Sequence, residues 1–432
     1  MKRIIMNQLI AWKESLQRKP LIINGARQVG KTYILQAFGR LHYRSVAYVN
    51  LEGQSEAARI FEHDFDIARI VRSLSALLGV HIEPAHTLII LDEVQECPAA
   101  LTALKYFLEN APQYHIVVAG SLLGISLHNQ ASFPVGKVDM LRMYPMTFCE
   151  FLSAIGQDPL ANLLNSHDLA AIDTLGERLT ECLRQYYFTG GMPAAVKEYV
   201  RTQNLTEVRR LQKQMLFDYR RDFSKHAPAA QVPRINQVWD SIPAQLAREN
   251  KKFLYGSLRK GARASEFELA IQWLLDAGLA YRIHRASSPT LPLKFYEDTS
   301  AFKLFMLDVG LMGAMADTPA ADILIGNNAF TEYKGALTEL YVLTQLMPLD
   351  IPIFYHSSND SRAEVDFLVQ SGSRIIPIEV KAEVNVRSKS LHAYIDKHPA
   401  LRGLRLSMLP ALSHEWMDNR PLYAPPCWLL QE

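Results

Sequence analysis

Cysteine is scarce in this sequence, with 4 among 432 residues. The four cysteines are too scattered for a zinc knuckle or a disulfide scaffold, and lie at Cys97, Cys149, Cys182 and Cys427. No apolar run approaches the roughly 20 residues that a membrane-spanning helix needs. The opening stretch MKRIIMNQLIAWKESL is amphipathic and lacks the apolar core of a signal peptide. We therefore expect reduced thiols, no membrane partner and a cytoplasmic location.

The chain also lacks a strong charge of either sign. Its formal net charge is +2, which by itself gives no argument for a nucleic-acid partner. Hydrophobic residues make up 49% and charged residues 21%, as in ordinary globular enzymes. A chain of 432 residues exceeds what a single core normally holds, so we expect two to three domains.

The most informative stretch present is GARQVGKT, residues 25–32, which follows an apolar run at Leu21–Asn24. It has the pattern G-x-x-x-x-G-K-[S/T] of a phosphate-binding loop, in which backbone N–H groups and a helix N-terminus converge on phosphates. The pattern predicts that Lys31 contacts the β- and γ-phosphates of ATP and that Thr32 binds Mg²⁺. The predicted nucleotide-binding residues are Gly25, Ala26, Arg27, Gln28, Val29, Gly30, Lys31 and Thr32.

A second motif, TLIILDEVQE, supplies the acidic half of a nucleotide site. Thr87–Leu91 is dense in apolar residues, as in a strand buried on both faces of a parallel sheet. It ends in Asp92 and Glu93, at the carboxyl end of the strand, where open α/β sheets bind ligands. We expect Asp92 to hold the Mg²⁺ shell and Glu93 to polarise the water that attacks the γ-phosphate.

A third apolar run, HIVVA, ends in Gly120 and Ser121. In phosphate-loop ATPases of the additional-strand type, a polar residue at this position contacts the γ-phosphate or the attacking water. Ser121 is therefore a candidate catalytic residue beside Glu93 and Lys31, and it is equally a candidate N-cap for a following helix.

The first third of the chain alternates strand and helix patterns, which indicates a parallel sheet covered on both faces. The predicted strands are Leu21–Asn24, Val46–Leu51, Thr87–Leu91, His115–Ala119 and Val138–Tyr144, and the predicted helices include Lys31–Gly39 and Ala99–Asn110.

The succession GARQVGKT, LDEVQE, AGSLL, MYPMTFCEFL and TGGMPAAV resembles the prokaryotic AAA-type ATPases that carry a C-terminal domain of unknown function. The resemblance implies ATP binding and hydrolysis on an AAA-like core. In that family an Arg usually follows a Gly shortly before the last core strand. Here the pair is Gly136 and Lys137, and a Lys cannot form the bidentate contact of an Arg with phosphate.

The middle of the chain is locally basic, with fourteen Lys and Arg against five Asp and Glu between residues 201 and 263. Val232–Asn250 and Ser265–Ala277 have amphipathic helical patterns, and Leu279–Arg285 resembles a strand. This order resembles a winged helix, with Ser265 as N-cap and Glu268 completing a capping box. The region either binds DNA, which needs its cations on one face, or serves packing and oligomer contacts. If the protein forms rings of several subunits, Arg220 or Arg221 would be a candidate arginine finger that acts on the ATP of a neighbouring subunit.

The final hundred residues contain a second group of candidate site residues, in the stretch EVDFLVQSGSRIIPIEVKAE. Asp366, Glu379 and Lys381 have the spacing D-x12-E-x-K, and residues i and i+2 of a strand share a face. This pattern resembles that of the PD-(D/E)XK nucleases, in which two carboxylates converge on a divalent metal with a Lys nearby. Glu339, on a preceding helix, would add a further carboxylate. Between the basic middle region and this group of residues, Asp308 is expected to cap a helix that begins near Val309.

The predicted fold class is α/β: an AAA-like phosphate-loop ATPase core at residues 1–200, a winged-helix-like basic region at 201–325, and a restriction-nuclease-like domain at 326–432. The expected function is Mg²⁺-dependent ATP hydrolysis whose nucleotide state controls a DNA-directed nuclease-like module. The alternative is a regulatory or scaffolding NTPase whose nuclease-like domain is catalytically silent and binds DNA or protein. Homo-oligomer formation, the nucleic-acid substrate and cleavage are left open by the sequence.

Overall fold

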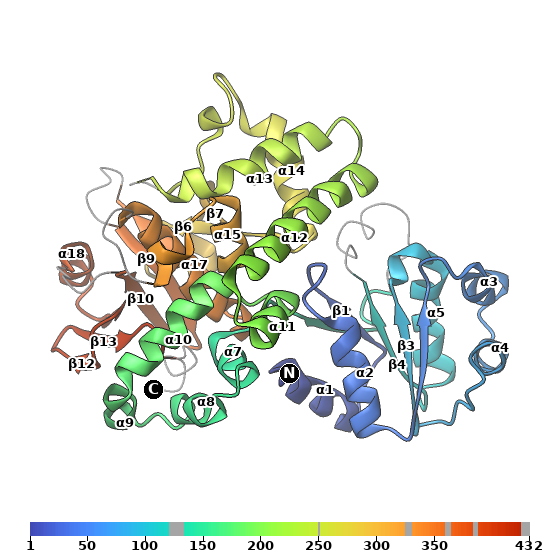
Figure 1. The fold of residues 1–432 in the computed structure, drawn as a ribbon. Helices are drawn as coiled ribbons and strands as arrows, with labels where there is room; N and C mark the ends of the chain where they lie inside the picture. The colour runs from blue at the N-terminus through green and yellow to red at the C-terminus, as the bar shows by residue number, and fades with distance from the viewer. Residues whose placement is uncertain (121–133, 249–250, 325–330, 359–363, 383–387, 425–432) are drawn as a thin grey trace. The chain divides into compact units, whose positions relative to one another are not determined.

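The computed structural model describes the chain except residues 121–133, 249–250, 325–330, 359–363, 383–387 and 425–432 (Figure 1). The chain forms two compact units. One, here called the N-terminal unit, comprises residues 2–144 with 276–278; the other, the C-terminal unit, comprises residue 1 with residues 145–275 and 279–432. Among the described residues, no helix combines the length and apolar character required to cross a bilayer.

The N-terminal unit is built on a parallel sheet with strand order β2-β3-β4-β1-β5 (Figure 1). Its strands are β1 (Leu21–Asn24), β2 (Ser45–Asn50), β3 (Thr87–Asp92), β4 (His115–Ala119) and β5 (Asp139–Arg142). Its helices are α1 (Ile5–Glu14), α2 (Lys31–His42), α3 (Ser55–His63), α4 (Ile67–Leu78) and α5 (Pro98–Asn110), with a 3₁₀ turn η1 (Val94–Glu96). The sequence patterns therefore predicted this sheet and its covering helices correctly.

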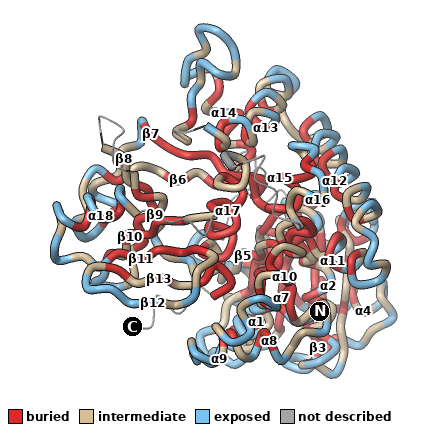
Figure 2. Tube along the Cα trace, turned by 60° about the vertical axis from the view of Figure 1, so that its left-hand side comes forward, coloured by how far each residue is buried: buried red, intermediate tan, exposed pale blue. Residues whose placement is uncertain are grey.

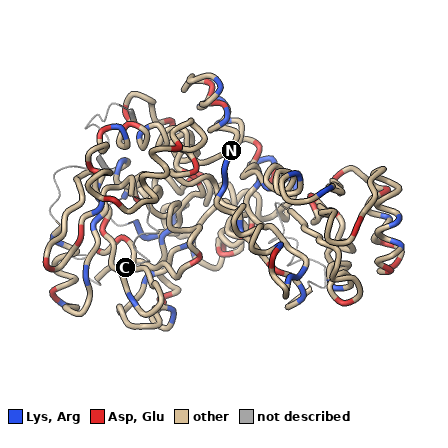
Figure 3. Tube along the Cα trace, turned by 90° about the horizontal axis from the view of Figure 1, so that it is seen from below, with Lys and Arg blue, Asp and Glu red and all other residues tan. Residues whose placement is uncertain are grey.

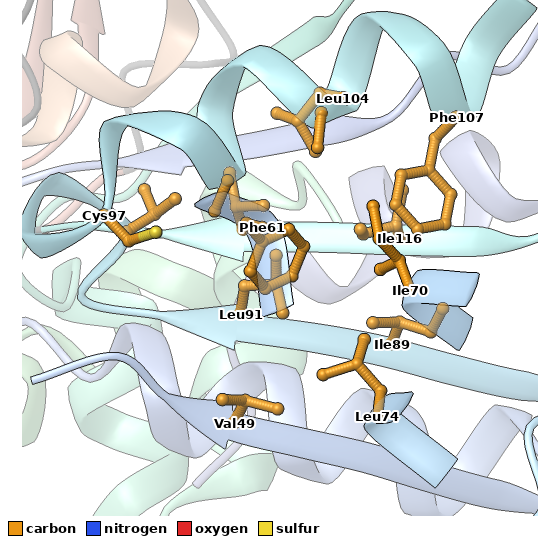
Figure 4. Packing of buried hydrophobic residues seen from close by; sticks show 14 of the residues in the cluster. Val49, Phe61, Ile70, Leu74, Ile89, Leu91, Cys97, Leu104, Phe107 and Ile116 are labelled. Atoms are coloured by element: carbon orange, nitrogen blue, oxygen red, sulfur yellow. The ribbon is translucent and has the colours of Figure 1, made fainter. Parts of the chain in front are cut away.

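Both faces of this sheet are buried, which explains its near-continuous apolar strands. Side chains of α3, α4 and α5 pack on one face, where Phe61, Leu104 and Phe107 lie against Ile89 and Ile116 (Figure 4). Helix α2 packs on β2 and β3, and α1 packs on α2. Burying each such large side chain contributes about 1.5–3 kcal/mol, so the sheet is a rigid support for the loops at its carboxyl edge.

The C-terminal unit begins with a set of helices. They are α7 (Phe148–Ala154), α8 (Asp158–Leu164), α9 (Leu169–Thr174), α10 (Gly176–Thr189), α11 (Pro193–Thr202), α12 (Leu205–His226), α13 (Val232–Leu246) and α14 (Ala264–Asp276). Helix α7 starts with a capping box, in which Thr147 and Glu150 satisfy each other's backbone N–H groups.

The rest of this unit forms an eight-stranded sheet with order β12-β13-β11-β10-β9-β8-β6-β7. The strands are β6 (Ala280–Ala286), β7 (Glu297–Met306), β8 (Ile353–Ser357), β9 (Glu364–Ser371), β10 (Arg374–Val380), β11 (Gly403–Ser407), β12 (Leu412–Ser413) and β13 (Met417–Pro421). The helices here are α15 (Val309–Met315), α16 (Ala320–Leu324), α17 (Thr331–Leu346) and α18 (Lys389–Lys397). Figure 2 shows much of α17 and of the central strands β10 and β11 as buried.

The predicted winged-helix order of two helices and a strand pair is present as α13, α14 and the antiparallel pair β6–β7. However, β6 also pairs in parallel with β8, through Arg285 and Tyr355. The strand pair therefore belongs to the same sheet as β9 and β10, and the predicted boundary at 325/326 falls within the span of one continuous sheet. Winged-helix character stays a prediction.

Two local predictions for this region were wrong. Helix α13 ends at Leu246 rather than Asn250 and contains Pro243. Helix α14 begins at Ala264, so Ser265 lies inside its first turn and is not the N-cap. The carboxylate of Glu266 accepts a hydrogen bond from the backbone N–H of Arg263 at 3.2 Å, and this contact satisfies a free N–H at the helix start two residues earlier than expected.

Asp308 caps α15 as predicted, and the structure shows a larger role. Its carboxylate accepts hydrogen bonds from the N–H of Leu311 at 2.9 Å and from the N–H of Gly191 at 2.6 Å. A Cβ at Gly190, where φ is +72°, would collide with the same carboxylate. Gly190 is thus required because the end of α10 lies directly against Asp308, whereas a Cβ at Gly191 would collide with the backbone carbonyl of Met146.

Burial raises the pKa of Asp308 to about 6, although backbone N–H groups from Gly191, Leu311 and Gly310 oppose the shift. An acid whose pKa is higher in the folded than in the unfolded chain stabilises the fold most at low pH, and this contribution is lost as pH rises through the folded-state value. The free energy of unfolding of the wild type, relative to Asp308→Asn, should therefore fall by about 1–2 kcal/mol between pH 5 and pH 7.5. Denaturant unfolding at both pH values checks this, and a pH-independent difference would contradict it.

Candidate functional sites

The phosphate-binding loop connects β1 to α2 at the carboxyl edge of the parallel sheet. Gly25 has φ +150°, and a Cβ there would collide with the backbone carbonyl of Met143, just after β5. Gly30 precedes α2 in a left-handed conformation with φ +95°. Both glycines of the motif are therefore required by the backbone itself, before any ligand is considered.

Lys31 is buried beneath this loop. Its Nζ donates hydrogen bonds to the carbonyl oxygens of Gly25 at 2.7 Å and Ala26 at 2.8 Å. Burial lowers the pKa of Lys31 to about 8, and the nearby carboxylates of Glu93 and Asp92 oppose the shift. The ammonium group is thus held inside the loop, where the phosphates of a nucleotide would provide stronger partners than neutral carbonyls.

Asp92 joins three elements of the site. One carboxylate oxygen accepts hydrogen bonds from the Thr32 hydroxyl at 2.6 Å and from the Tyr48 hydroxyl at 3.0 Å. The other oxygen accepts from the backbone N–H of Glu93 at 3.0 Å. Burial raises the pKa of Tyr48 to about 12, and the adjacent Asp92 adds to the shift, so Tyr48 stays a hydrogen-bond donor. The structure thus brings the predicted Mg²⁺ ligands Thr32 and Asp92 together and adds Tyr48, which the sequence reasoning missed.

Glu93 follows Asp92 in a left-handed backbone conformation, with φ +50°. Its carboxylate accepts a hydrogen bond from the side-chain amide of Gln95 at 2.6 Å. Gln95 lies in the VQE turn of the motif, so the turn orients the candidate base. A Mg²⁺–triphosphate needs oxygen ligands for the metal and a positive charge for the phosphates. Here Thr32 and Asp92 supply the oxygen atoms, and the buried Lys31 supplies the charge, with the half-buried carboxylate of Glu93 beside them. The residues present therefore fit this group.

Arg3 is a further residue of this site that no motif indicated. Its guanidinium donates to the carbonyl oxygen of Val29, inside the phosphate-binding loop, at 3.0 Å and to that of Tyr144 at 2.6 Å. Arg3 is buried, so these hydrogen bonds fix the outer side of the loop to the segment after β5. A single Arg near the start of a sequence offers no spacing pattern that would reveal this contact.

Two other predicted positions need comment. Ser121 lies outside the described residues, so its role stays a prediction. Lys137 precedes β5, whose Asp139 pairs with Leu21 at the start of β1, and its Nζ pairs with Glu109 at 3.0 Å. It therefore lies at the amino edge of the sheet, about four strand residues or roughly 13 Å from the carboxyl edge. This position gives no support to a γ-phosphate contact from Lys137, in line with the weaker phosphate contact expected of a Lys in place of Arg.

The second cluster lies in the C-terminal unit, where β9 and β10 form the predicted antiparallel hairpin. One oxygen of Asp366 accepts a hydrogen bond from the backbone N–H of Val380 at 2.8 Å, which places Asp366 beside Glu379. Glu379 is buried and pairs with Lys381 at 3.1 Å. Burial raises the pKa of Glu379, and Lys381 opposes the shift. The three motif residues therefore meet on one face of the hairpin, as predicted.

Glu339 reaches this cluster from α17, again as predicted, but its partners were not foreseen. It pairs with Lys251 and lies 3.5 Å from the Nζ of Lys303. Lys303 in turn pairs with Glu364 at 2.6 Å. Two signals could have found these residues: Lys303 is a lone cation in the apolar strand KLFM, and Glu364 shares a strand face with Asp366.

The predicted metal ligands Asp366 and Glu379 do not form a preassembled metal centre. Within the described part of the chain, no group of three or more His, Cys, Asp or Glu side chains is arranged to hold a metal ion. The carboxylates of this cluster are instead engaged by lysines and by a backbone N–H. The donor set therefore does not fit a divalent metal as it stands.

Several cations of the basic middle region have acidic partners. Figure 3 shows Lys and Arg interspersed with Asp and Glu along the chain. Many of its cations are ion-paired: Arg201 with Glu198, Arg210 with Glu207, Lys213 with Asp317, Arg220 with Asp240, and Arg259 with Glu266. DNA binding by this region stays a prediction. Arg220, a candidate trans-acting finger, has an acidic partner in its own chain.

Replacing Arg3 with Met should weaken ATP binding about tenfold, because two charge-assisted hydrogen bonds that hold the phosphate-binding loop are lost. Arg40→Met, on the exposed surface of α2, is the matched control and should bind like the wild type. Titration with a fluorescent ATP analogue measures both. A folded Arg3→Met variant with wild-type affinity would show that the loop needs no such support.

Three segments of the chain match models of known protein families. Residues 17–152 match the family model described as AAA domain, residues 180–322 match a domain of unknown function (DUF8612), and residues 334–414 match another domain of unknown function (DUF4143). Among curated proteins, none matches the chain.

Solved structures that resemble the chain include a Walker-type ATPase of Pyrococcus abyssi, at 14% identity and a TM-score of 0.47, with coverage of 73% of this chain and 95% of that one. The ORC1 protein of Aeropyrum pernix in complex with DNA has 14% identity and a TM-score of 0.30, with 75% and 95% covered. The RuvB Holliday junction branch migration motor of Thermotoga maritima has 16% identity and a TM-score of 0.29, with 64% and 88% covered.

The family match confirms the resemblance to AAA-type ATPases for the first part of the chain, and the match at residues 334–414 confirms a C-terminal domain of unknown function. Residues 17–152, which include the phosphate-binding loop and the parallel sheet, are therefore similar to an AAA domain, and two later segments are similar to domains of unknown function.

Proposed function

We propose that this chain is a Mg²⁺-dependent ATP hydrolase whose nucleotide state controls its C-terminal module. The observation that carries the proposal is the contact of Thr32 with Asp92 at 2.6 Å, next to Glu93 and the buried Lys31. These side chains come from two motifs far apart in sequence, and the sheet brings them to one edge. A phosphate-binding loop alone would support nucleotide binding, whereas the adjacent Glu93 supports hydrolysis.

In this proposal each residue has a separate task. Lys31 leaves the carbonyl oxygens of Gly25 and Ala26 and contacts the β- and γ-phosphates. Thr32 and Asp92 hold Mg²⁺, which when bound neutralises charge on the phosphate oxygens. Glu93, oriented by Gln95, accepts a proton from the attacking water. Ser121 is the proposed γ-phosphate contact.

Glu93→Gln should retain ATP binding, while the hydrolysis rate falls about a hundredfold or more, because an amide cannot accept the proton of the attacking water. Lys31→Ala, tested in parallel, should lose binding as well as turnover. A phosphate-release assay and an equilibrium ATP titration separate the two effects. Wild-type hydrolysis in Glu93→Gln would remove Glu93 from the mechanism.

For the C-terminal module, we propose a DNA-directed role that ATP regulates, with Asp366, Glu379, Lys381 and Glu339 forming a nuclease-like site. The hairpin geometry supports the nuclease-like arrangement. A specific observation favours the alternative of a silent module: its carboxylates are already paired with lysines. In that case the chain is a regulatory or scaffolding NTPase, and its module binds DNA or protein without cutting.

If the module is directed to DNA, double-stranded or single-stranded DNA should raise the ATPase rate of the wild type, because binding energy at one site is then coupled to the other. A cleavage assay with Mg²⁺ or Mn²⁺ runs alongside. Cleavage that Asp366→Ala and Lys381→Ala abolish would support a nuclease, and cleavage that neither alters would exclude this site. Coupling without any nicking would support the silent module, and an ATPase rate indifferent to both DNA forms would contradict a DNA-directed role.

A further inference from the structure

The nuclease-like cluster contains more cations than its motif requires. Four carboxylates and four basic groups meet there: Glu339, Glu364, Asp366 and Glu379, with Lys251, Lys303, Lys381 and Arg405. Only Lys381 belongs to the D-x12-E-x-K pattern. A divalent-metal site of this class needs an excess of negative charge, whereas the described residues of this cluster are together formally neutral.

Lys303 is the most deeply placed of the added cations. Its side chain is 0% exposed, and its Nζ lies 2.6 Å from Glu364 and 3.5 Å from Glu339. The same ammonium lies over the ring of Tyr355, 5.0 Å from its centre. A buried ammonium is strongly unfavourable without charged partners, so folding itself commits Glu364 and part of Glu339 to Lys303.

Lys251 supplies the second added cation, from the segment between α13 and α14. Its side chain is 17% exposed and pairs with Glu339, whose side chain is 3% exposed. Burial lowers the pKa of Lys251 to about 8, and the charges of Asp366 and Glu364 oppose the shift. The ammonium of Lys251 therefore lies among the carboxylates on which a metal would depend, and it comes from outside the segment that carries the motif.

Two buried carboxylate oxygens of the cluster accept no hydrogen bond from a described residue, and one of them, Oε1 of Glu364, is ion-paired with Lys303. Oε2 of Glu379 is buried and accepts no hydrogen bond from any described residue. A divalent cation that used this oxygen together with Asp366 and Glu339 would have to displace Lys251 or tolerate its positive charge at close range. Like charges close together in a partly buried site repel each other strongly, because little water screens them.

We propose that Lys251 is a built-in cation that takes the place of a divalent metal and keeps the nuclease-like cluster from binding one. This inference deepens the proposed role of the C-terminal module and does not depend on ATP hydrolysis. It identifies removal of the Lys251 charge as the change that converts the cluster into a site for Mn²⁺ or Mg²⁺, with Glu379 as a required ligand.

Calorimetric titration of the nucleotide-free full-length chain with MnCl₂ tests the proposal. Lys251→Ala should gain a Mn²⁺ site at least roughly tenfold tighter than any in the wild type, and adding Glu379→Gln should remove it. Lys251→Gln, which can still donate a hydrogen bond to Glu339, should show the same gain and serves if the Ala variant does not fold. Lys251→Arg keeps the charge and Lys260→Ala removes an exposed lysine of the same segment, so neither should gain the site.

Wild-type binding of Mn²⁺ with equal affinity at a site that Glu379→Gln abolishes would overturn the proposal. Folded Lys251→Ala and Lys251→Gln variants without any new site would overturn it as well. Because the titration contains no nucleotide, its outcome is separate from the ATPase assays: failure of the Glu93 prediction would leave this result intact, and the reverse also holds.

Discussion

Buried charge must be paired, and this requirement shapes every functional part of the chain. Lys31 is held by loop carbonyls, Asp92 by two hydroxyls and an N–H, and Lys303 by two carboxylates. The hydroxyls on Asp92 and the carboxylates on Lys303 come from elements distant in sequence, so these pairs can form only when the sheets are assembled, whereas Lys31 is paired within its own loop. The cost of an unpaired charge thus links correct folding to correct site geometry.

The two clusters meet this requirement in opposite ways. In the N-terminal unit, Lys31 has neutral carbonyls as partners, which charged phosphates can replace with a gain in electrostatic energy. In the C-terminal unit, Lys303 and Lys251 have carboxylates as partners, which a ligand can replace only at a cost. The site around Lys31 is therefore suited to bind a ligand, whereas the cluster around Lys303 and Lys251 is suited to neutralise its own charges.

The sequence allowed the parallel sheet and the nucleotide site to be predicted closely, because both follow from local patterns. Strands β1 and β4 have the predicted bounds, and Thr32, Asp92 and Glu93 meet as expected. Tyr48, Arg3 and Lys251 were missed because their contacts join segments with no shared motif. Ser265 was predicted as the N-cap of α14, but the side chain of Glu266 satisfies the start of this helix instead.

The pairing of β6 with β8 has a consequence for how this chain can change over evolution. Because strands from residues 280–306 and from residues 353–421 complete one sheet, neither portion can be exchanged for that of another protein without exposing an unpaired strand edge. Recombination would therefore preserve the two portions as a single inherited module, although family comparison divides them into separate domains of unknown function.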